Sequence, residues 1–144
     1  MKYWLTVGRF QPLHDGHEAL IRSKLDEGKN VIVLIRDTKK SKKNPYSLYD
    51  RRVMFYKRFE TELYREQLEI MSCPDIEGIF YGRDVGYKVE QVRLDKKTES
   101  ISGTKIRKEG KEGKSFDKEI YNKPVMDILT KHKDIKLDPN NKEY

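Results

Sequence analysis

The stretch KYWLTVGRFQPLHDGHEALIRSKLDEGKNVIVLIRD, residues 2–37, decides the fold of this chain. Residues 2–8 are a short run with β propensity that ends on a glycine, and residues 30–37 are a continuous apolar run typical of a parallel strand covered on both faces. Between them, apolar residues from about Glu18 recur at helical spacing until Gly28. Strand, helix and strand in so short a stretch predict a βαβ unit with a right-handed crossover.

The rest of the chain continues the alternation of strands and helices. A lysine-rich loop comes first, and after it we expect a helix at 48–63, strands at 67–73 and 78–82, a half-exposed or edge strand at 87–94, a loop with a short helix at 101–110 that stops at Gly110, and a last helix at 116–132. This order predicts an α/β fold: an open, mostly parallel sheet with helices on both faces, in a single domain.

Composition narrows the class of partner. The chain has 144 residues with a net charge of +7, and its lysines and arginines are spread along its whole length. This charge favours nucleotides, phosphorylated metabolites or nucleic acid without choosing among them. One cysteine, Cys73, excludes an internal disulfide and suits a reducing compartment. No apolar run approaches the roughly 20 residues of a membrane span, and the start is too quickly polar for a signal peptide, so we expect a cytoplasmic protein without a membrane partner.

The loop after the first strand carries the candidate chemistry. Residues 9–17, RFQPLHDGH, fall at the carboxyl end of a parallel strand, where open α/β sheets bind ligands. The helix that follows offers backbone N–H groups and a partial positive charge, which suit a phosphate. His14 and His17 are three apart and can point the same way, beside Arg9. Gly16 would let a nucleotide approach the backbone, so the loop predicts a polyphosphate site.

Three segments resemble a known superfamily. GRFQPLHDGH, residues 8–17, resembles the (H/T)xGH signature of the nucleotidyltransferases, and ISGTKIRK, residues 101–108, resembles their second motif, ISxTxIR. KNPYSLYDRR, residues 43–52, resembles the NPF…ER segment of archaeal-type nicotinamide-mononucleotide (NMN) adenylyltransferases. The resemblance covers residues 3 to about 110. It implies a Rossmann-like nucleotidyltransferase domain over 1–132, followed by a polar C-terminal tail at 133–144.

The resemblance implies a direct transfer of a nucleotidyl group. An acceptor phosphate attacks the α-phosphate of a nucleoside triphosphate, ATP favoured over CTP, and pyrophosphate leaves. Mg²⁺ accompanies the triphosphate, and no metal ligand from the protein is expected. NMN is the leading acceptor, and cytidylyl transfer of the glycerol-phosphate type is the alternative within the superfamily.

The same resemblance assigns roles to residues. His14, His17 and Arg107 are implied to be catalytic. The implied nucleotide-binding residues are Gly8, Arg9, Phe10, Gly16, Ser102, Gly103 and Thr104. The implied acceptor or lid residues are Lys42, Lys43, Asn44, Arg83 and Tyr87. Of these, Arg83 and Tyr87 lie in a segment that departs from the plain strand and loop of several adenylyltransferases, and would shape a base or acceptor pocket.

Other readings of the sequence stay open at this point. A nucleic-acid-binding module would use the +7 charge and the Arg- and Tyr-rich helix at 48–59. A catalytically silent relative would bind a nucleotide as a sensor. The lysines of residues 38–45 form either a lid over bound phosphates or a solvated loop. A homo-oligomer is also left open.

Overall fold

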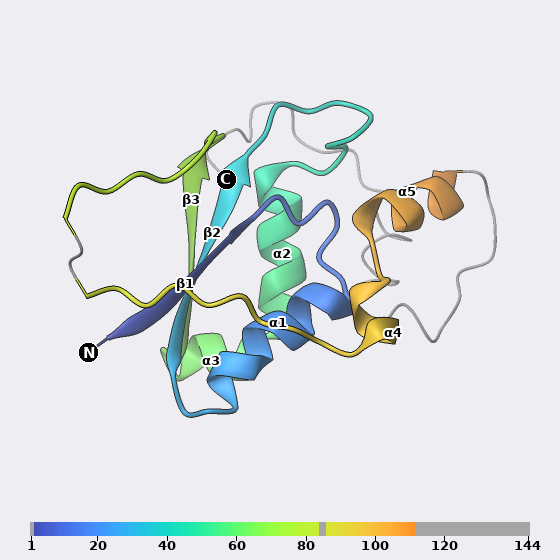
Figure 1. The fold of residues 1–144 in the computed structure, drawn as a ribbon. Coiled ribbons are helices and arrows are strands. Elements are labelled where there is room, and N and C mark those ends of the chain that lie inside the picture. Colours follow the sequence, from blue (N-terminus) through green and yellow to red (C-terminus); the bar gives the residue numbers. More distant parts are fainter. Residues whose placement is uncertain (1, 84–85, 112–144) are drawn as a thin grey trace.

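The computed structural model describes residues 2–83 and 86–111, which form a parallel α/β domain (Figure 1). Its sheet has the order β1-β2-β3, and both pairs of neighbouring strands are parallel. The strands are β1 (Tyr3–Gly8), β2 (Asn30–Asp37) and β3 (Leu68–Pro74). The helices are α1 (Asp15–Leu25), α2 (Leu48–Arg58), α3 (Glu60–Tyr64), α4 (Lys96–Glu99) and α5 (Gly103–Lys111). The predicted βαβ unit and the α/β class are confirmed.

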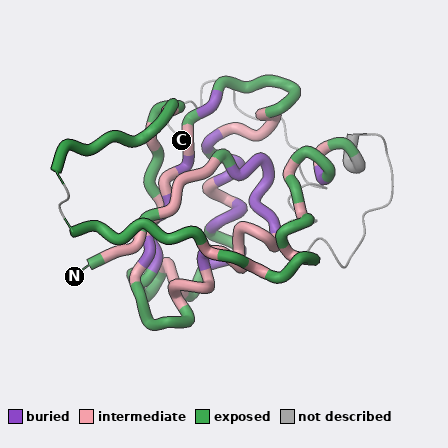
Figure 2. Tube along the Cα trace, viewed as in Figure 1, coloured by how far each residue is buried: buried purple, intermediate pink, exposed green. Residues whose placement is uncertain are grey.

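One hydrophobic core joins the sheet to helices α1 and α2. On β2, Val31, Val33 and Ile35 are buried, and they belong to the same cluster as Ile21 of α1 and Phe55 of α2. Figure 2 shows this buried interior between sheet and helices. Because β1, β2 and β3 follow one another in the same direction across the sheet, two right-handed crossovers place their helices on the same face.

The other face of the sheet carries no helix in the part of the chain that the structure describes. Leu5 of β1 is 55% exposed and Met71 of β3 is 48% exposed, while Ile32 and Leu34 of β2 are half-buried. The helix predicted at 116–132 and the tail at 133–144 lie outside the described residues.

Local capping explains where two helices begin. Helix α1 starts at Asp15, earlier than predicted, because His14 caps it. Helix α2 starts after Ser47, whose hydroxyl accepts from the N–H of Asp50 while that carboxylate accepts from the N–H of Ser47, both at 3.0 Å. The predicted single helix at 48–63 is broken into α2 and α3 at Phe59, whose φ of −124° and ψ of 30° are not helical.

Two predicted strands are absent from the described structure. Residues 78–82 form no strand, and neither do residues 87–94; their side chains include Ile79 and Phe80, which are 80% and 96% exposed. A strand needs a neighbour for its backbone hydrogen bonds, and this segment instead arcs away from β3 before returning toward α4 (Figure 1). At the end of the described chain, α5 continues through Gly110 to Lys111 rather than stopping at the glycine.

Candidate active site

The loop between β1 and α1 is held by a buried aromatic ring. Phe10 has a φ of 51°, in the left-handed region, and its side chain is buried. A Cβ on Gly8 would lie 2.9 Å from the tip of this ring, so the glycine makes room for Phe10. The ring contacts Phe55 and His17 edge-on, with centroids 4.9 and 4.8 Å apart. Gly8 and Phe10, both predicted to bind the nucleotide, pack together in this loop, and the Phe10 ring lies against His17.

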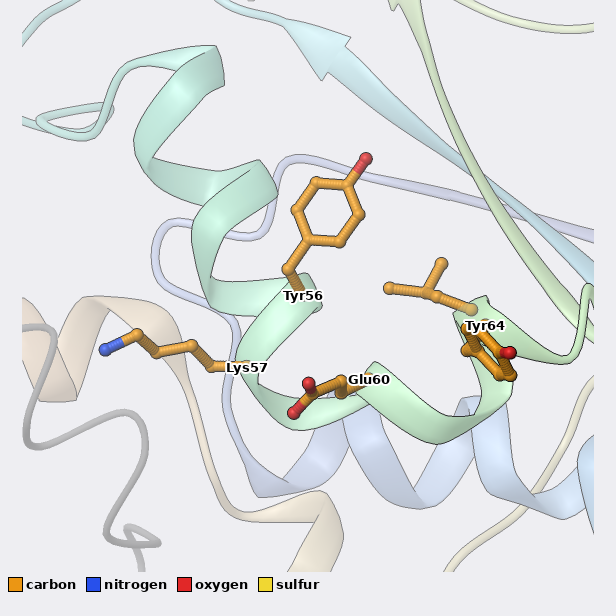
Figure 3. Close-up of a pocket in the computed structure, with 5 residues that line it drawn as sticks. Tyr56, Lys57, Glu60 and Tyr64 are labelled. Carbon is orange, nitrogen blue, oxygen red and sulfur yellow. The ribbon is translucent and has the colours of Figure 1, made fainter.

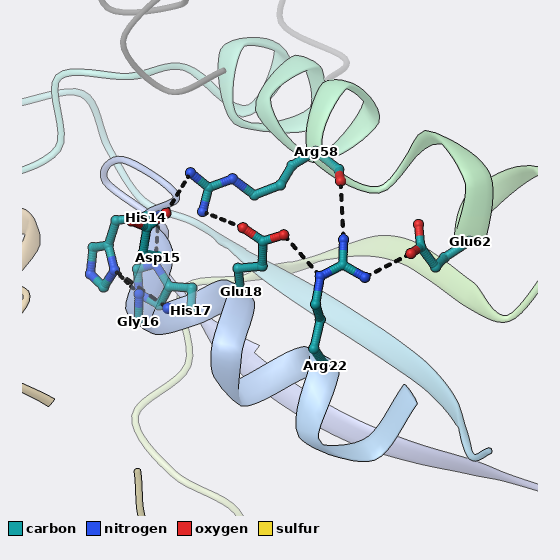
Figure 4. A network of polar contacts seen from close by, with 8 residues as sticks. All are labelled: His14, Asp15, Gly16, His17, Glu18, Arg22, Arg58 and Glu62. Atoms are coloured by element: carbon teal, nitrogen blue, oxygen red, sulfur yellow. Dashed lines mark hydrogen bonds and ion pairs between the residues drawn. The ribbon is translucent and has the colours of Figure 1, made fainter. Parts of the chain in front are cut away.

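The two histidines form one stacked unit at the start of α1 (Figure 4). Their ring centroids are 3.7 Å apart and their planes differ by 18°. The Nδ1 of His14 accepts from the N–H of Gly16 at 3.0 Å and from that of His17 at 3.4 Å. The backbone N–H of His14 donates to Nδ1 of His17 at 3.2 Å. Because each Nδ1 accepts a hydrogen bond, each neutral ring carries its proton on Nε2.

Burial keeps both imidazoles uncharged at neutral pH. It lowers the pKa of His14 to about 4, and the charge of Arg58 adds to this effect. Burial also lowers the pKa of His17 well below its usual value, with His14 and Arg58 as the further causes. The pair thus presents two fixed N–H donors rather than two cations.

The histidines change the role expected for the helix N-terminus. The amides of Gly16 and His17 are not free for a phosphate, because both bond to the ring of His14. A Cβ on Gly16 would lie 2.9 Å from Cε1 of that ring and 3.4 Å from the carbonyl oxygen of Thr98. Gly16 therefore makes room for the imidazole and for α4; its predicted contact with a nucleotide stays a prediction. The helix end offers the Nε2–H groups of the two imidazoles as donors.

Helix α5 brings the second motif against this loop. Ser102 caps it, since its hydroxyl accepts from the N–H three residues on at 3.1 Å. The Arg107 guanidinium donates through Nη1 to the carbonyl of Gln11 and through Nη2 to the Thr104 hydroxyl at 3.2 Å. A Cβ on Gly103 would lie 3.0 Å from that same carbonyl oxygen, so glycine allows this close contact without crowding. The structure thus brings the two sequence motifs together.

Two arginines give the site its positive charge. Burial lowers the pKa of Arg107, and the charge of Arg9 lowers it further, so the two guanidinium groups lie within electrostatic reach of each other. Arg9 also donates to the side chain of Asn44 at 3.3 Å, which ties the lysine loop to the site. Lys42 and Lys43 are exposed on that loop. This arrangement suits an anionic ligand.

The remaining predicted acceptor residues lie elsewhere. Arg83 and Tyr87 belong to the exposed arc between β3 and α4, and Tyr87 is 83% exposed. Among the described contacts, neither residue reaches the two motifs. The structure therefore does not assemble the pocket predicted from these two side chains.

Sequence reasoning missed Gln11, whose side chain joins two loops. The amide is buried; it donates to the carbonyl of Tyr46 at 3.0 Å and accepts from the N–H of Tyr46 at 2.9 Å. The same nitrogen lies 3.3 Å from the Thr38 hydroxyl. The backbone carbonyl of Gln11 accepts a hydrogen bond from Arg107. Gln11 therefore links the first motif to both the second motif and the lysine loop. Nothing in the local sequence pattern distinguishes this role.

Sequence reasoning also missed Arg51, which is fully buried. It donates to the carbonyls of Arg9 and Arg36, each at 2.8 Å, and to that of Ser47 at 3.1 Å. These bonds hold the carboxyl ends of β1 and β2 to the start of α2. The sequence did contain a signal for the burial of Arg51, because this residue lies four positions before Phe55 and shares a helical face with that apolar side chain.

A shallow groove of about 520 Å³ lies on the outer side of α2 and α3 (Figure 3). It is lined by Tyr56, Lys57, Glu60, Leu63 and Tyr64, none of which is a predicted site residue.

Across residues 2–83 and 86–111, no three His, Cys, Asp or Glu side chains gather as metal ligands. Over the same ranges, every helix is too short or too polar to span a bilayer.

Known proteins resemble this chain in its fold and in the sequence of its first half. Residues 5–69, which include most of β1, the histidine pair and β2, match the family described as cytidylyltransferase-like. No curated protein matches the chain. A solved structure of a bifunctional NMN adenylyltransferase/ADP-ribose pyrophosphatase from Francisella tularensis, complexed with AMP and Mn ion, is similar with a TM-score of 0.54 and 17% identity. The match covers 94% of this chain and 50% of that one, so the chain spans half the length of that protein and shares its fold.

Proposed function

We propose that this protein transfers a nucleotidyl group from a nucleoside triphosphate to a phosphorylated small-molecule acceptor and releases pyrophosphate. The observation that carries the proposal is the stacked, uncharged pair of His14 and His17, with Arg107 of α5 held on the carbonyl of Gln11 beside it. The cytidylyltransferase-like match and the shared fold support a nucleotidyltransferase in general.

The histidine pair suits the charge that develops during transfer. An oxygen of the acceptor phosphate bonds to the α-phosphorus, the bond from that phosphorus to the bridging oxygen breaks, and its electron pair leaves with pyrophosphate. His14 and His17 would donate their Nε2–H groups to the α- and β-phosphates and to the bridging oxygen. Since their directions are already fixed by the Nδ1 bonds, they need little reorganisation in the transition state.

The second motif would hold the rest of the triphosphate, which enters as its Mg²⁺ complex. Thr104 and the amides near Ser102 and Gly103 would bind the β- and γ-phosphates at the start of α5. Arg107 would clamp two phosphate oxygens, and Arg9 would do so nearer the acceptor. Positioning and charge neutralisation of this kind are the main demands of phosphoryl-transfer chemistry.

We favour adenylyl transfer to NMN, because residues 8–12 and 43–46 resemble the NMN adenylyltransferases; cytidylyl transfer of the glycerol-phosphate type is the alternative. A pyrophosphate-release screen decides between them. It pairs MgATP and MgCTP with NMN, glycerol 3-phosphate and other phosphorylated acceptors. Release of pyrophosphate that requires both a triphosphate and an acceptor supports the proposal. No release with any pair, together with oligonucleotide binding that falls steeply with salt, would favour a nucleic-acid-binding module.

Replacing Arg107 by Lys tests the clamp. The substitution keeps the charge but removes the planar fork that donates in two directions. We expect kcat/KM for the triphosphate to fall about tenfold. The control is Arg93→Lys, since Arg93 has a side chain 71% exposed and pairs only with Glu99 among the described contacts. Equal kinetics for the two folded variants would contradict the role of Arg107.

The double change of Lys42 and Lys43 to Ala tests the lid. We expect triphosphate KM to rise about fivefold at low salt, with a weaker dependence on ionic strength, because exposed charges act through screened attraction. Lys2 and Lys29, at the amino ends of β1 and β2, provide a control double variant with the same change in net charge. If both double variants show the same KM and salt response, residues 38–45 are a solvated loop.

A further inference from the structure

A buried arginine joins the end of α2 to the start of α1 (Figure 4). The side chain of Arg58 is 2% exposed, and its guanidinium lies 3.1 Å from Asp15 and 3.1 Å from Glu18. Both carboxylate residues belong to the first turn of α1, where one precedes His17 in the sequence and the other follows it. Arg58 thus holds the turn that carries the histidine pair through the two carboxylates of that turn.

A second arginine shares the same carboxylate and provides a natural comparison. Arg22 pairs with Glu18 at 2.9 Å and with Glu62 of α3 at 2.7 Å, and it donates to the carbonyl of Arg58 at 3.4 Å. Its side chain is 33% exposed, and the described contacts do not join it to Asp15. The two arginines belong to one network, but only Arg58 holds both carboxylates of the first turn.

The charged groups near the imidazoles belong to five segments of the chain. Arg58 contributes to the lowered pKa of both His14 and His17, whereas Arg22 does not. The other charged groups of this turn and of the helix packed on α1 are Asp15 and Glu18 of α1 and the exposed Lys96, Lys97 and Glu99 of α4. Arg9 and Arg107 belong to the loop after β1 and to α5, where they contact Asn44 and Gln11. Arg58 is the buried cation among them, and burial strengthens its effect.

We propose that Arg58 is a positioning residue for the histidine pair: by bridging Asp15 and Glu18 it places a buried positive charge beside the two rings and preserves their uncharged, cap-forming state. A proton on Nδ1 of either ring would remove the acceptor for a backbone N–H and open the cap. Without Arg58, Asp15 would lose the arginine that pairs with it and Glu18 would keep only Arg22, so the negative charge of the turn would favour protonated rings. The kinetic part of this inference rests on the proposed function, but its titration part does not.

The titration is measured by NMR on the histidine ring protons. In Arg58→Met, we expect the midpoints of His14 and His17 to move to higher pH. In Arg58→Lys, which keeps the charge, they stay close to those of the wild type. Arg22→Met is the matched control, and its midpoints are unchanged. The chain has a third histidine, His132, whose ring-proton signal is identified by its loss in His132→Gln.

The second readout is the pH dependence of kcat/KM. We expect the acid limb of Arg58→Met to move upward by about one pH unit, with no such movement in Arg22→Met. Midpoints that do not move in folded Arg58→Met would overturn the inference. An equal upward movement of the midpoints in Arg22→Met would also overturn it. If Arg58→Met does not fold, midpoints that move upward in Arg58→Lys, which keeps the charge, would overturn it instead. If the histidine midpoints move in Arg58→Met while the wild-type protein shows no turnover, the result supports the role of Arg58 and counts only against the proposed function.

Discussion

Replacing His17 by Gln lowers kcat by about 10²-fold or more and leaves the protein folded. The loss follows because one fixed N–H donor to the transition state disappears, and removing a single oxyanion-type donor has an effect of this size. Glutamine at the third position of the helix can still accept from the N–H of His14, as the His17 ring does at 3.2 Å. Steady-state pyrophosphate release and urea unfolding at pH 7 measure the two effects separately.

Two further variants make the result specific. His17→Ala removes both the donor and the capping acceptor, so we expect the same loss of kcat together with about 1 kcal/mol lower stability. His132→Gln carries the same chemical change at the remaining histidine and is expected to keep wild-type kinetics. Turnover near the wild-type level in folded His17→Gln would remove His17 from the proposed mechanism.

The stability of the protein falls between pH 6.5 and pH 4. The folded pKa of His14 is about 4, below its ordinary value of 6.5, so the unfolded chain binds more protons across this range. The stabilisation is complete above pH 6.5 and is lost as the pH falls toward 4. His14 alone accounts for about 3 kcal/mol. His17 acts in the same direction, because its pKa is also lowered, mainly by burial.

His14→Asn isolates this contribution. Asparagine is a good N-cap whose side-chain oxygen can accept from the amides of Gly16 and His17, and it does not titrate. We expect this variant to be folded at pH 7 and to lose about 3 kcal/mol less than the wild type between pH 6.5 and 4. Urea unfolding at a series of pH values gives both curves. Asp15, whose pKa is raised mainly by burial, is present in both proteins, so its effect cancels in the difference. Parallel curves would contradict a neutral capping role for His14.

The sequence alone determined the elements whose signals are local. The βαβ unit from Tyr3 to Asp37 follows from two β-prone runs and a helical pattern between them, and the start of the next helix at residue 48 was predicted as well. The proximity of the two motifs was also predictable, through the resemblance. The βαβ unit and the start of the second helix depend on residues a few positions apart, whose geometry the backbone period sets.

Only the tertiary structure decided what individual side chains do at the site. Arg107 meets the carbonyl of Gln11 across 96 positions, and Arg51 meets that of Arg9 across 42. Phe10, by contrast, turns into the core because its φ is positive and Gly8 leaves space for its ring. Likewise, residues 78–82 have a strand-like pattern but no strand beside them in the described structure. Hydrogen bonds, burial and charge between distant segments depend on how those segments pack, and no local pattern in the chain records that packing.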